Sequence, residues 1–162
     1  MEELTLHKSL QLAAKTEQLG AEFYEKMARK FSSQKDIAEI FSNLSKDEKI
    51  HEAQFRAILD KTPIDDNESN YEVGLFVKAI AISEFFRIEQ FKRAGDIKTA
   101  DEALGAALAF EKSTLLYYQE LMETLGDSDQ LRAIIKAEKG HIMSLTRLIV
   151  TDAQFRGIRD NW

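Results

Sequence analysis

Two stretches of this chain carry ionisable side chains on helical faces that are otherwise apolar: Glu17-Gln-Leu-Gly-Ala-Glu-Phe-Tyr24 and Glu48-Lys-Ile-His51. The second half of the chain repeats the pattern with Glu111, Tyr118 seven residues later, and Glu138-Lys-Gly-His141. Residues seven apart lie two helical turns apart, and residues three apart share a face. Each group therefore points its polar side chains in one direction, and the chain contains an internal repeat of two halves.

Helical periodicity surrounds both halves of the repeat. Apolar residues recur every three or four positions along most of the chain, which holds only 7 Gly and 1 Pro. Pairs typical of capping boxes mark four helix starts: Ser33 with Asp36, Ser69 with Glu72, Thr99 with Glu102, and Asp127 with Gln130. The expected helices cover about 5–31, 33–61, 69–94, 99–126 and 127–150. The fold class is all-α.

The connections predict how these helices are arranged. Very short turns join the first helix to the second and the fourth to the fifth, which makes each pair an antiparallel hairpin. A long crossover over about 61–98, containing the extra helix, separates the two hairpins. The sequence therefore predicts one domain over 1–150, a four-helix bundle with a crossover, followed by a tail over 151–162.

Composition excludes several classes of protein. The 162 residues include no cysteine, so a disulfide framework, a thiolate metal site and a thiol nucleophile are absent. The net charge is -6 and the pI is near 5.2, which argues against nucleic acid as a partner. No apolar run is long enough to span a membrane, and no signal peptide is recognisable, so no membrane partner is expected. A cytoplasmic protein is the expectation.

The carboxylates on the apolar faces indicate a metal site. Four ionised carboxylates in a bundle core would each cost several kcal/mol without compensation, and two divalent cations would balance their charge. Carboxylate oxygen with imidazole nitrogen suits iron or manganese better than a structural zinc site. The alternative is that these are surface carboxylates of a metal-free helical interaction module. The inward-facing residues are Glu17, Glu48, His51, Glu111, Glu138 and His141.

The arrangement resembles the ferritin-like di-iron carboxylate proteins, and most closely the rubrerythrins, over about Leu6 to Val150. That superfamily places a Glu on each of two bundle helices and Glu-x-x-His on each of the other two. The resemblance implies a ferritin-like bundle that binds two iron ions, with manganese or zinc as substitutes. The implied metal ligands, which are also the catalytic residues, are Glu17, Glu48, His51, Glu111, Glu138 and His141. By this resemblance, the terminal ligands are Glu17 and Glu111, and the bridging ligands are Glu48 and Glu138. Tyr24 and Tyr118 are the implied groups that form hydrogen bonds with ligand carboxylates.

The resemblance also implies a function, a non-haem di-iron oxidoreductase that reduces hydrogen peroxide or dioxygen. Rubrerythrins proper carry a rubredoxin module with four cysteines; this chain has none, so an external donor protein is expected to supply electrons. Thr114 stands where rubrerythrins have an additional carboxylate, which leaves a symmetric set of six ligands. Because the same ligands serve ferritins, iron binding and oxidation for storage or detoxification is the alternative.

The crossover helix predicts an assembly. Apolar residues between Leu75 and Phe91 cover well over half of its circumference, more than one bundle needs. Either the tail, through Phe155 and Trp162, covers the outer side, or a second copy does. Large apolar patches are rare on monomers, so a homodimer or a larger assembly of dimers is expected, with Phe85 and Phe86 at the interface.

Overall fold

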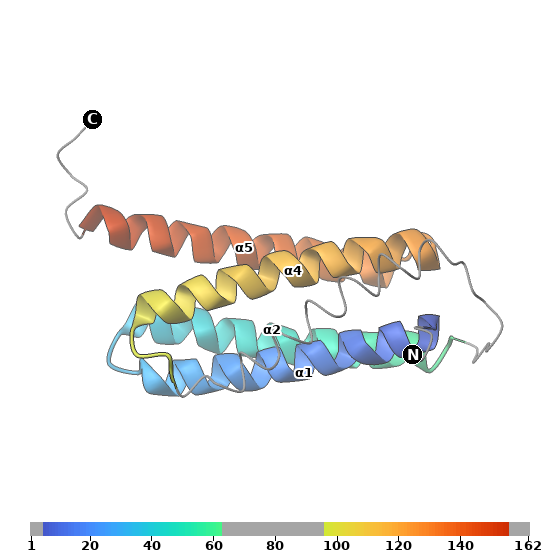
Figure 1. Cartoon of the computed structure of the whole chain (residues 1–162), viewed down its shortest axis with the longest axis horizontal. Helices are drawn as coiled ribbons and strands as arrows, with labels where there is room; N and C mark the ends of the chain where they lie inside the picture. The colour runs from blue at the N-terminus through green and yellow to red at the C-terminus, as the bar shows by residue number, and fades with distance from the viewer. Residues whose placement is uncertain (1–4, 63–95, 156–162) are drawn as a thin grey trace.

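The computed structural model describes residues 5–62 and 96–155, and these form a bundle of four long helices (Figure 1). The helices are α1 (Leu6–Lys30), α2 (Lys35–Leu59), α4 (Ala100–Leu125) and α5 (Asp129–Phe155). With 25 to 27 residues each, they extend for about 35–40 Å. The all-α, ferritin-like bundle expected from the sequence is confirmed.

The directions of the helices explain why a crossover is needed. Short turns make α1 antiparallel to α2 and α4 antiparallel to α5 (Figure 1). The end of α2 and the beginning of α4 lie at opposite ends of the bundle, so these two helices run in the same direction. The long connection predicted between the hairpins agrees with this separation of the two helix ends.

Of the predicted capping boxes that lie in the described residues, one forms as expected and two do not. The box at Thr99 forms as predicted: its hydroxyl accepts from the Glu102 amide at 3.2 Å, and the Glu102 carboxylate accepts from the Thr99 amide at 3.1 Å. The predicted box at Ser33 is wrong. Residues 31–34 form a turn in which the Gln34 amide donates to the Phe31 carbonyl, so α2 begins only at Lys35.

The start of α5 also differs from the prediction. Asp127 pairs with Arg132, and the Ser128 hydroxyl instead accepts from the Leu131 amide at 3.4 Å. The helix therefore begins at Asp129, and it continues to Phe155, beyond the expected end near Val150.

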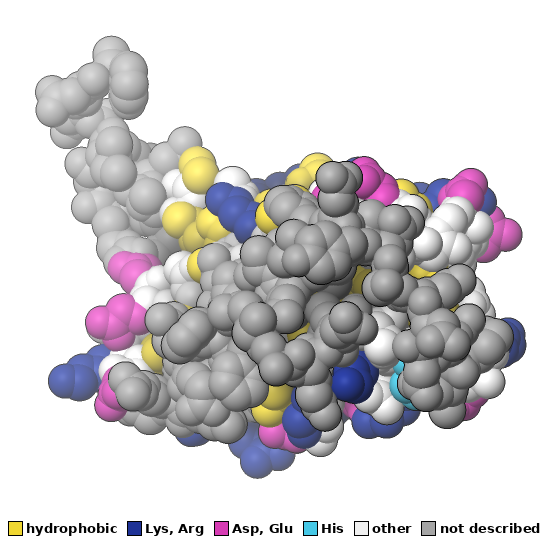
Figure 2. Space-filling model, turned by 45° about the vertical axis from the view of Figure 1, so that its right-hand side comes forward, with side chains coloured by type: hydrophobic (Ala, Val, Ile, Leu, Met, Phe, Trp, Pro, Cys, Tyr) yellow, Lys and Arg dark blue, Asp and Glu magenta, His cyan; other side chains and the backbone are white. Residues whose placement is uncertain are grey.

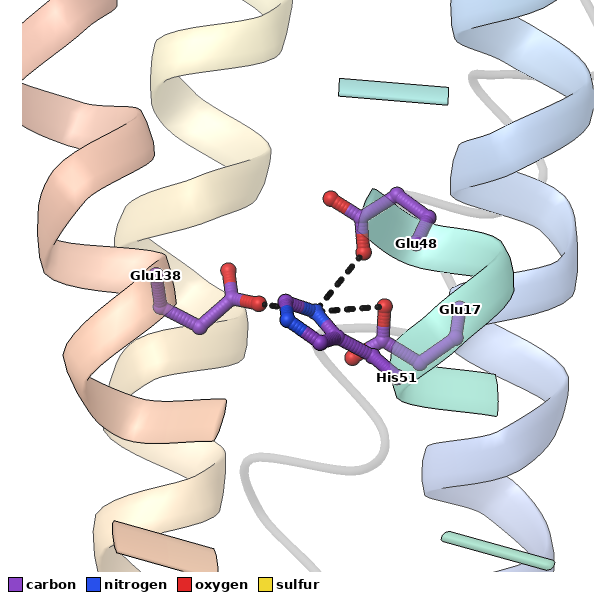
Figure 3. A group of neighbouring side chains, drawn as sticks. All are labelled: Glu17, Glu48, His51 and Glu138. Atoms are coloured by element: carbon purple, nitrogen blue, oxygen red, sulfur yellow. Dashed lines mark ion pairs between the residues drawn. The ribbon is translucent and has the colours of Figure 1, made fainter. Parts of the chain in front are cut away.

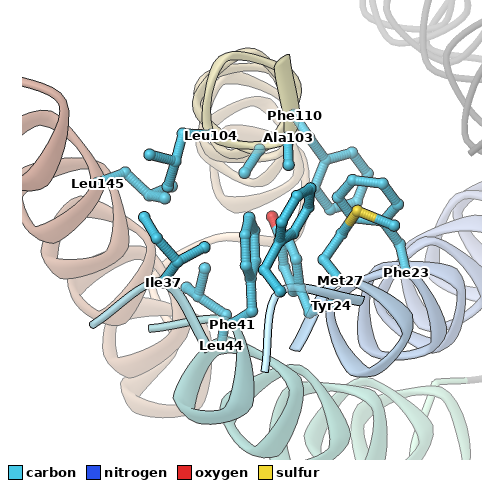
Figure 4. Packing of buried hydrophobic residues seen from close by; sticks show 12 residues of the cluster. Phe23, Tyr24, Met27, Ile37, Phe41, Leu44, Ala103, Leu104, Phe110 and Leu145 are labelled. Atoms are coloured by element: carbon cyan, nitrogen blue, oxygen red, sulfur yellow. The ribbon is translucent and has the colours of Figure 1, made fainter. Parts of the chain in front are cut away.

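Two apolar clusters fill the bundle, one toward each end. The first combines residues of all four helices, among them Leu10, Phe55, Tyr117 and Leu131. The second, drawn in Figure 4, also combines side chains of all four helices around Tyr24 and Phe41. Along every helix the two clusters are separated by about two to three turns. The space between the clusters is where the six polar residues lie.

Several predictions fall outside the described residues. The predicted crossover helix over 69–94 lies there, together with Phe85, Phe86 and Trp162, so the dimer remains a prediction.

Among the described helices, none is long and apolar enough to cross a membrane. On the face shown in Figure 2, acidic and basic side chains are interspersed over the described surface.

Gly20 allows α4 to approach α1 closely. It is buried in α1, and a Cβ there would lie 3.0 Å from Phe110 Cε1 on α4 and 3.6 Å from Glu48 Cγ on α2. Phe110 is 1% exposed and packs edge-on against Tyr24, so it has little freedom to move away. The absence of a side chain at position 20 therefore sets how closely Phe110 and α4 approach α1.

We predict that Gly20→Ala lowers the free energy of unfolding by about 1 kcal/mol, because overpacking outweighs the helix propensity that alanine adds. The matched control is Gly105→Ala on α4, where no described atom lies within 4 Å of the new Cβ. That control should gain about 0.5–1 kcal/mol. Urea unfolding followed by circular dichroism measures both variants. Equal stabilisation of the two would contradict the close packing at Gly20.

Candidate metal centre

The six predicted ligands meet in the middle of the bundle, each between the two apolar clusters. Every helix contributes at least one of them, and the exposed fraction of each residue is between 0% and 7%. The apolar residues before and after each ligand fix which face of its helix turns inward. The residues are Glu17 on α1, Glu48 and His51 on α2, Glu111 on α4, and Glu138 and His141 on α5.

The ligand atoms form two overlapping groups. One consists of Glu17, Glu48, His51 and Glu138, drawn in Figure 3, and the other of Glu48, Glu111, Glu138 and His141. In each group every residue offers one oxygen or nitrogen, and these atoms lie within 4.8 Å of one another. Both groups share Glu48 and Glu138. The site therefore has room for two metal ions that share two carboxylates.

His51 turns its Nδ1 toward the first group. This nitrogen lies 2.9 Å from Glu138 Oε1, 3.6 Å from Glu48 Oε2 and 3.7 Å from Glu17 Oε2. The three carboxylates come from three different helices and converge on one nitrogen, as Figure 3 shows. In this arrangement, one imidazole nitrogen and three carboxylate oxygens face the same space.

His141 does the same in the second group. Its Nδ1 lies 3.1 Å from Glu111 Oε2, 3.5 Å from Glu48 Oε1 and 3.7 Å from Glu138 Oε2. The ring stacks on that of His51 with centroids 5.6 Å apart. Its other nitrogen, Nε2, lies 3.2 Å from Asp47 Oδ2. Sequence reasoning assigned no role to Asp47, although it precedes Glu48 and lies one turn before His51 on the same helix.

The two predicted tyrosines hydrogen-bond ligand carboxylates across the bundle. The Tyr24 hydroxyl on α1 donates to Glu111 Oε1 on α4 at 2.5 Å, and the Tyr118 hydroxyl on α4 donates to Glu17 Oε1 on α1. Burial, together with the neighbouring carboxylates, raises the pKa of both tyrosines well above the ordinary value. Both hydroxyls therefore keep their protons. Tyr24 orients Glu111, and Tyr118 orients Glu17.

Thr114 lies beside the centre, at the position where the rubrerythrin pattern has an additional carboxylate. Its hydroxyl lies 3.1 Å from the Glu111 carbonyl and 3.4 Å from Glu138 Oε2. It is buried and brings no charge. The described ligand set therefore contains four carboxylates and two imidazoles.

Burial is the largest cause of the raised pKa values of two carboxylates of this centre, Glu48 and Glu111. It raises the pKa of Glu48 well above the usual range, and the charges of Glu17 and Glu111 add to the effect. Burial and the neighbouring Glu138 raise the pKa of Glu111 to about 8. Burial alone would raise the pKa of Glu138 too, but hydrogen bonds with both histidines hold it below its ordinary value. The centre concentrates negative charge that needs a counter-charge.

In the metal-free chain that counter-charge comes from protons. Burial alone would lower the pKa of both histidines, but hydrogen bonds with Glu138 and Glu17 raise that of His51 to about 9. Hydrogen bonds with Glu111 and Glu138 raise the pKa of His141 to about 11. Both imidazoles are thus protonated at neutral pH, and a metal ion has to displace these protons.

The residues fit two divalent metal ions. Four buried atoms of the centre make no well-directed hydrogen bond, although each lies within 3.7 Å of an oppositely charged group: Glu17 Oε2, Glu48 Oε1, Glu138 Oε1 and His51 Nδ1. Their residues belong to the two groups of converging atoms. Buried polar groups are normally satisfied by well-directed hydrogen bonds, so oxygens and a nitrogen that lack them and face one space fit a metal site. Oxygen with imidazole nitrogen suits iron, manganese or zinc.

We predict that Mn(II) raises the melting temperature, and that the rise is larger at pH 8 than at pH 6. The bound metal compensates the buried carboxylates, while His51 and His141 must lose protons for it to bind, so higher pH favours binding. Each proton released changes the apparent affinity by up to about tenfold per pH unit. Differential scanning calorimetry at both pH values measures the effect. A shift that is absent, or larger at pH 6, would contradict this centre.

The comparisons with known proteins agree with the geometry. The family model Rubrerythrin matches residues 8–149, which includes all six ligands and both tyrosines. Neither a curated protein nor a solved structure gives a significant match. The match covers most of the chain, and it agrees with the topology of the bundle and with the buried cluster of four Glu and two His. The chain therefore belongs to the rubrerythrin family, and its 162 residues contain no cysteine.

Proposed function

We propose that this protein binds two iron ions and reduces hydrogen peroxide or dioxygen with electrons from an external donor protein. The observation that carries the proposal is the pair of buried ligand groups that share Glu48 and Glu138. When bound, two ferrous ions would supply the two electrons that cleave the O–O bond of one peroxide molecule. With two protons from solvent, the products are two molecules of water.

The geometry supports a role for each ligand. Glu48 and Glu138 belong to both groups, so they would bridge the two ions. Glu17 and His51 belong to the first group alone, and Glu111 to the second. We therefore assign Glu17 and His51 to one ion, and Glu111 with His141 to the other. Six protein ligands leave open positions for a small oxidant, because two of the carboxylates are shared.

The rest of the chain prepares the centre for this chemistry. Tyr24 and Tyr118 each hold one terminal carboxylate oxygen, which leaves the second oxygen of Glu111 and Glu17 free to point inward. The two apolar clusters keep bulk water away from both sides of the polar layer. No cysteine is available for a rubredoxin-type iron site in this chain, so the electrons that restore the ferrous state come from another protein.

A second candidate function is iron oxidation for storage or detoxification, with dioxygen as the oxidant. Thr114 favours it, because the neutral hydroxyl leaves the symmetric six-ligand set that ferritin-like proteins share. A metal-free interaction module is the third possibility. Metal analysis of the purified protein separates it from the other two, since a module without metal would contain no stoichiometric iron, manganese or zinc.

We predict that Glu48→Gln weakens both metal positions, while His51→Ala mainly weakens one. Glu48 faces both histidines, at 3.6 Å from His51 and 3.5 Å from His141, whereas His51 takes part in one group only. Anaerobic Fe(II) titration with equilibrium dialysis measures the stoichiometry. Glu123→Gln, an exposed carboxylate on α4, is the matched control and should bind two equivalents. Equal loss of both metals in the two site variants would overturn the assigned roles.

Stopped-flow oxidation distinguishes the two candidate reactions. Protein loaded anaerobically with two Fe(II) is mixed with either one equivalent of hydrogen peroxide or dissolved dioxygen, and the remaining ferrous iron is measured with a chelator. The proposed peroxidase oxidises both irons per peroxide, reacts faster with peroxide than with dioxygen, and turns over when a reductant is added. Faster reaction with dioxygen, followed by release of ferric iron, would favour the storage function instead. The Glu48→Gln variant should lose the fast phase, and Glu123→Gln should keep it.

A further inference from the structure

We propose that Asp47 is a positioning residue that orients His141 and makes the His141 side of the dimetal site the tighter metal position. This inference rests on the proposed function, because it requires two metal positions. It adds to the proposed function that the two halves of the repeat, which look alike in sequence, bind metal with unequal affinity. Three observations on the described residues support it.

The first observation is the geometry of the His141 ring. Its Nδ1 faces Glu111 Oε2 at 3.1 Å, inside the centre, and its Nε2 faces Asp47 Oδ2 at 3.2 Å, on the opposite edge of the ring. A metal bound at Nδ1 requires the proton to reside on Nε2, where it is donated to Asp47. A carboxylate that accepts from the outer nitrogen of a ligating histidine fixes the tautomer and ring angle and makes the ligand more basic.

The second observation is that His51 has no equivalent partner among the described residues. All three of its ion-pair contacts use Nδ1, with Glu138, Glu48 and Glu17. In the repeat, the position that corresponds to Asp47 is the residue before Glu138, which is Ala137. The methyl side chain of alanine cannot accept a hydrogen bond. Within the part of the chain described here, the His141 ring is therefore contacted at both nitrogens and the His51 ring at one.

The third observation is access. A groove of about 400 Å³ runs between α2 and α5, and both Asp47 and His141 line it, whereas His51 does not. The Asp47 side chain is 49% exposed, while that of His141 is 8% exposed. The carboxylate therefore stands between solvent and the buried ring. Because Asp47 is half-exposed, its replacement leaves no buried cavity, and variants at this position can be tested in the folded chain.

The effect expected from losing such a partner is a 10- to 100-fold weaker affinity for one metal. The variants are Asp47→Ala, which removes the acceptor, and Asp47→Asn, which keeps an acceptor oxygen without the charge. The matched control is Asp36→Ala, which removes the same charge from the same groove without a contact to His141. Anaerobic Co(II) titration of the full chain, followed by visible absorption, measures both affinities.

The expected result is two unequal affinities in the wild type, with the tighter one weakened in Asp47→Ala, partly restored in Asp47→Asn and unchanged in Asp36→Ala. The Zn(II)-loaded protein gives a second readout. Its ¹⁵N spectrum should show one imidazole Nε2–H proton that exchanges slowly with solvent. The absence of this signal in His141→Ala assigns it to His141, and in Asp47→Ala the proton should exchange rapidly. Wild-type affinities for both metals in Asp47→Ala would overturn this inference alone. Failure of the wild type to bind metal would overturn the proposed function and this inference with it.

Discussion

The rest of this structure depends on one constraint: four carboxylates and two imidazoles are buried together in the middle of a helical bundle. Such a cluster is costly unless protons or metal ions compensate its charge. In the metal-free chain the two histidines carry raised pKa values, about 9 and about 11, and supply part of that compensation. Two divalent cations would supply all of it, and four buried oxygen and nitrogen atoms without a well-directed hydrogen bond converge there.

The apolar core is arranged around this constraint. It is divided into two clusters, and the polar layer lies between them on all four helices. A hydrophobic core of this kind holds the polar side chains in place from both ends and limits the access of water to them. Gly20 adds a local requirement beside this layer, since a Cβ there would lie only 3.0 Å from the Phe110 ring of α4.

The internal repeat is symmetric in its ligands and asymmetric in what surrounds them. Tyr24 and Tyr118 act equivalently on Glu111 and Glu17, and Glu48 and Glu138 are equivalent in belonging to both groups. Asp47 breaks the symmetry, because its counterpart in the repeat is Ala137. Two metal positions with similar ligands can thus differ in affinity through one hydrogen bond at the edge of a groove.

The sequence by itself determined the helices, the two hairpins and the six inward-facing ligands, because helical periodicity is local and places residues three, four and seven apart on one face. It failed at Ser33 and Asp127, where tight turns decided the start of the helix. Only the tertiary structure decided that Tyr24 donates to Glu111, that Tyr118 donates to Glu17, and that Asp47 contacts His141. Those partners lie between 87 and 101 residues apart along the chain, and which of them meet depends on how the helices pack, which no local pattern encodes.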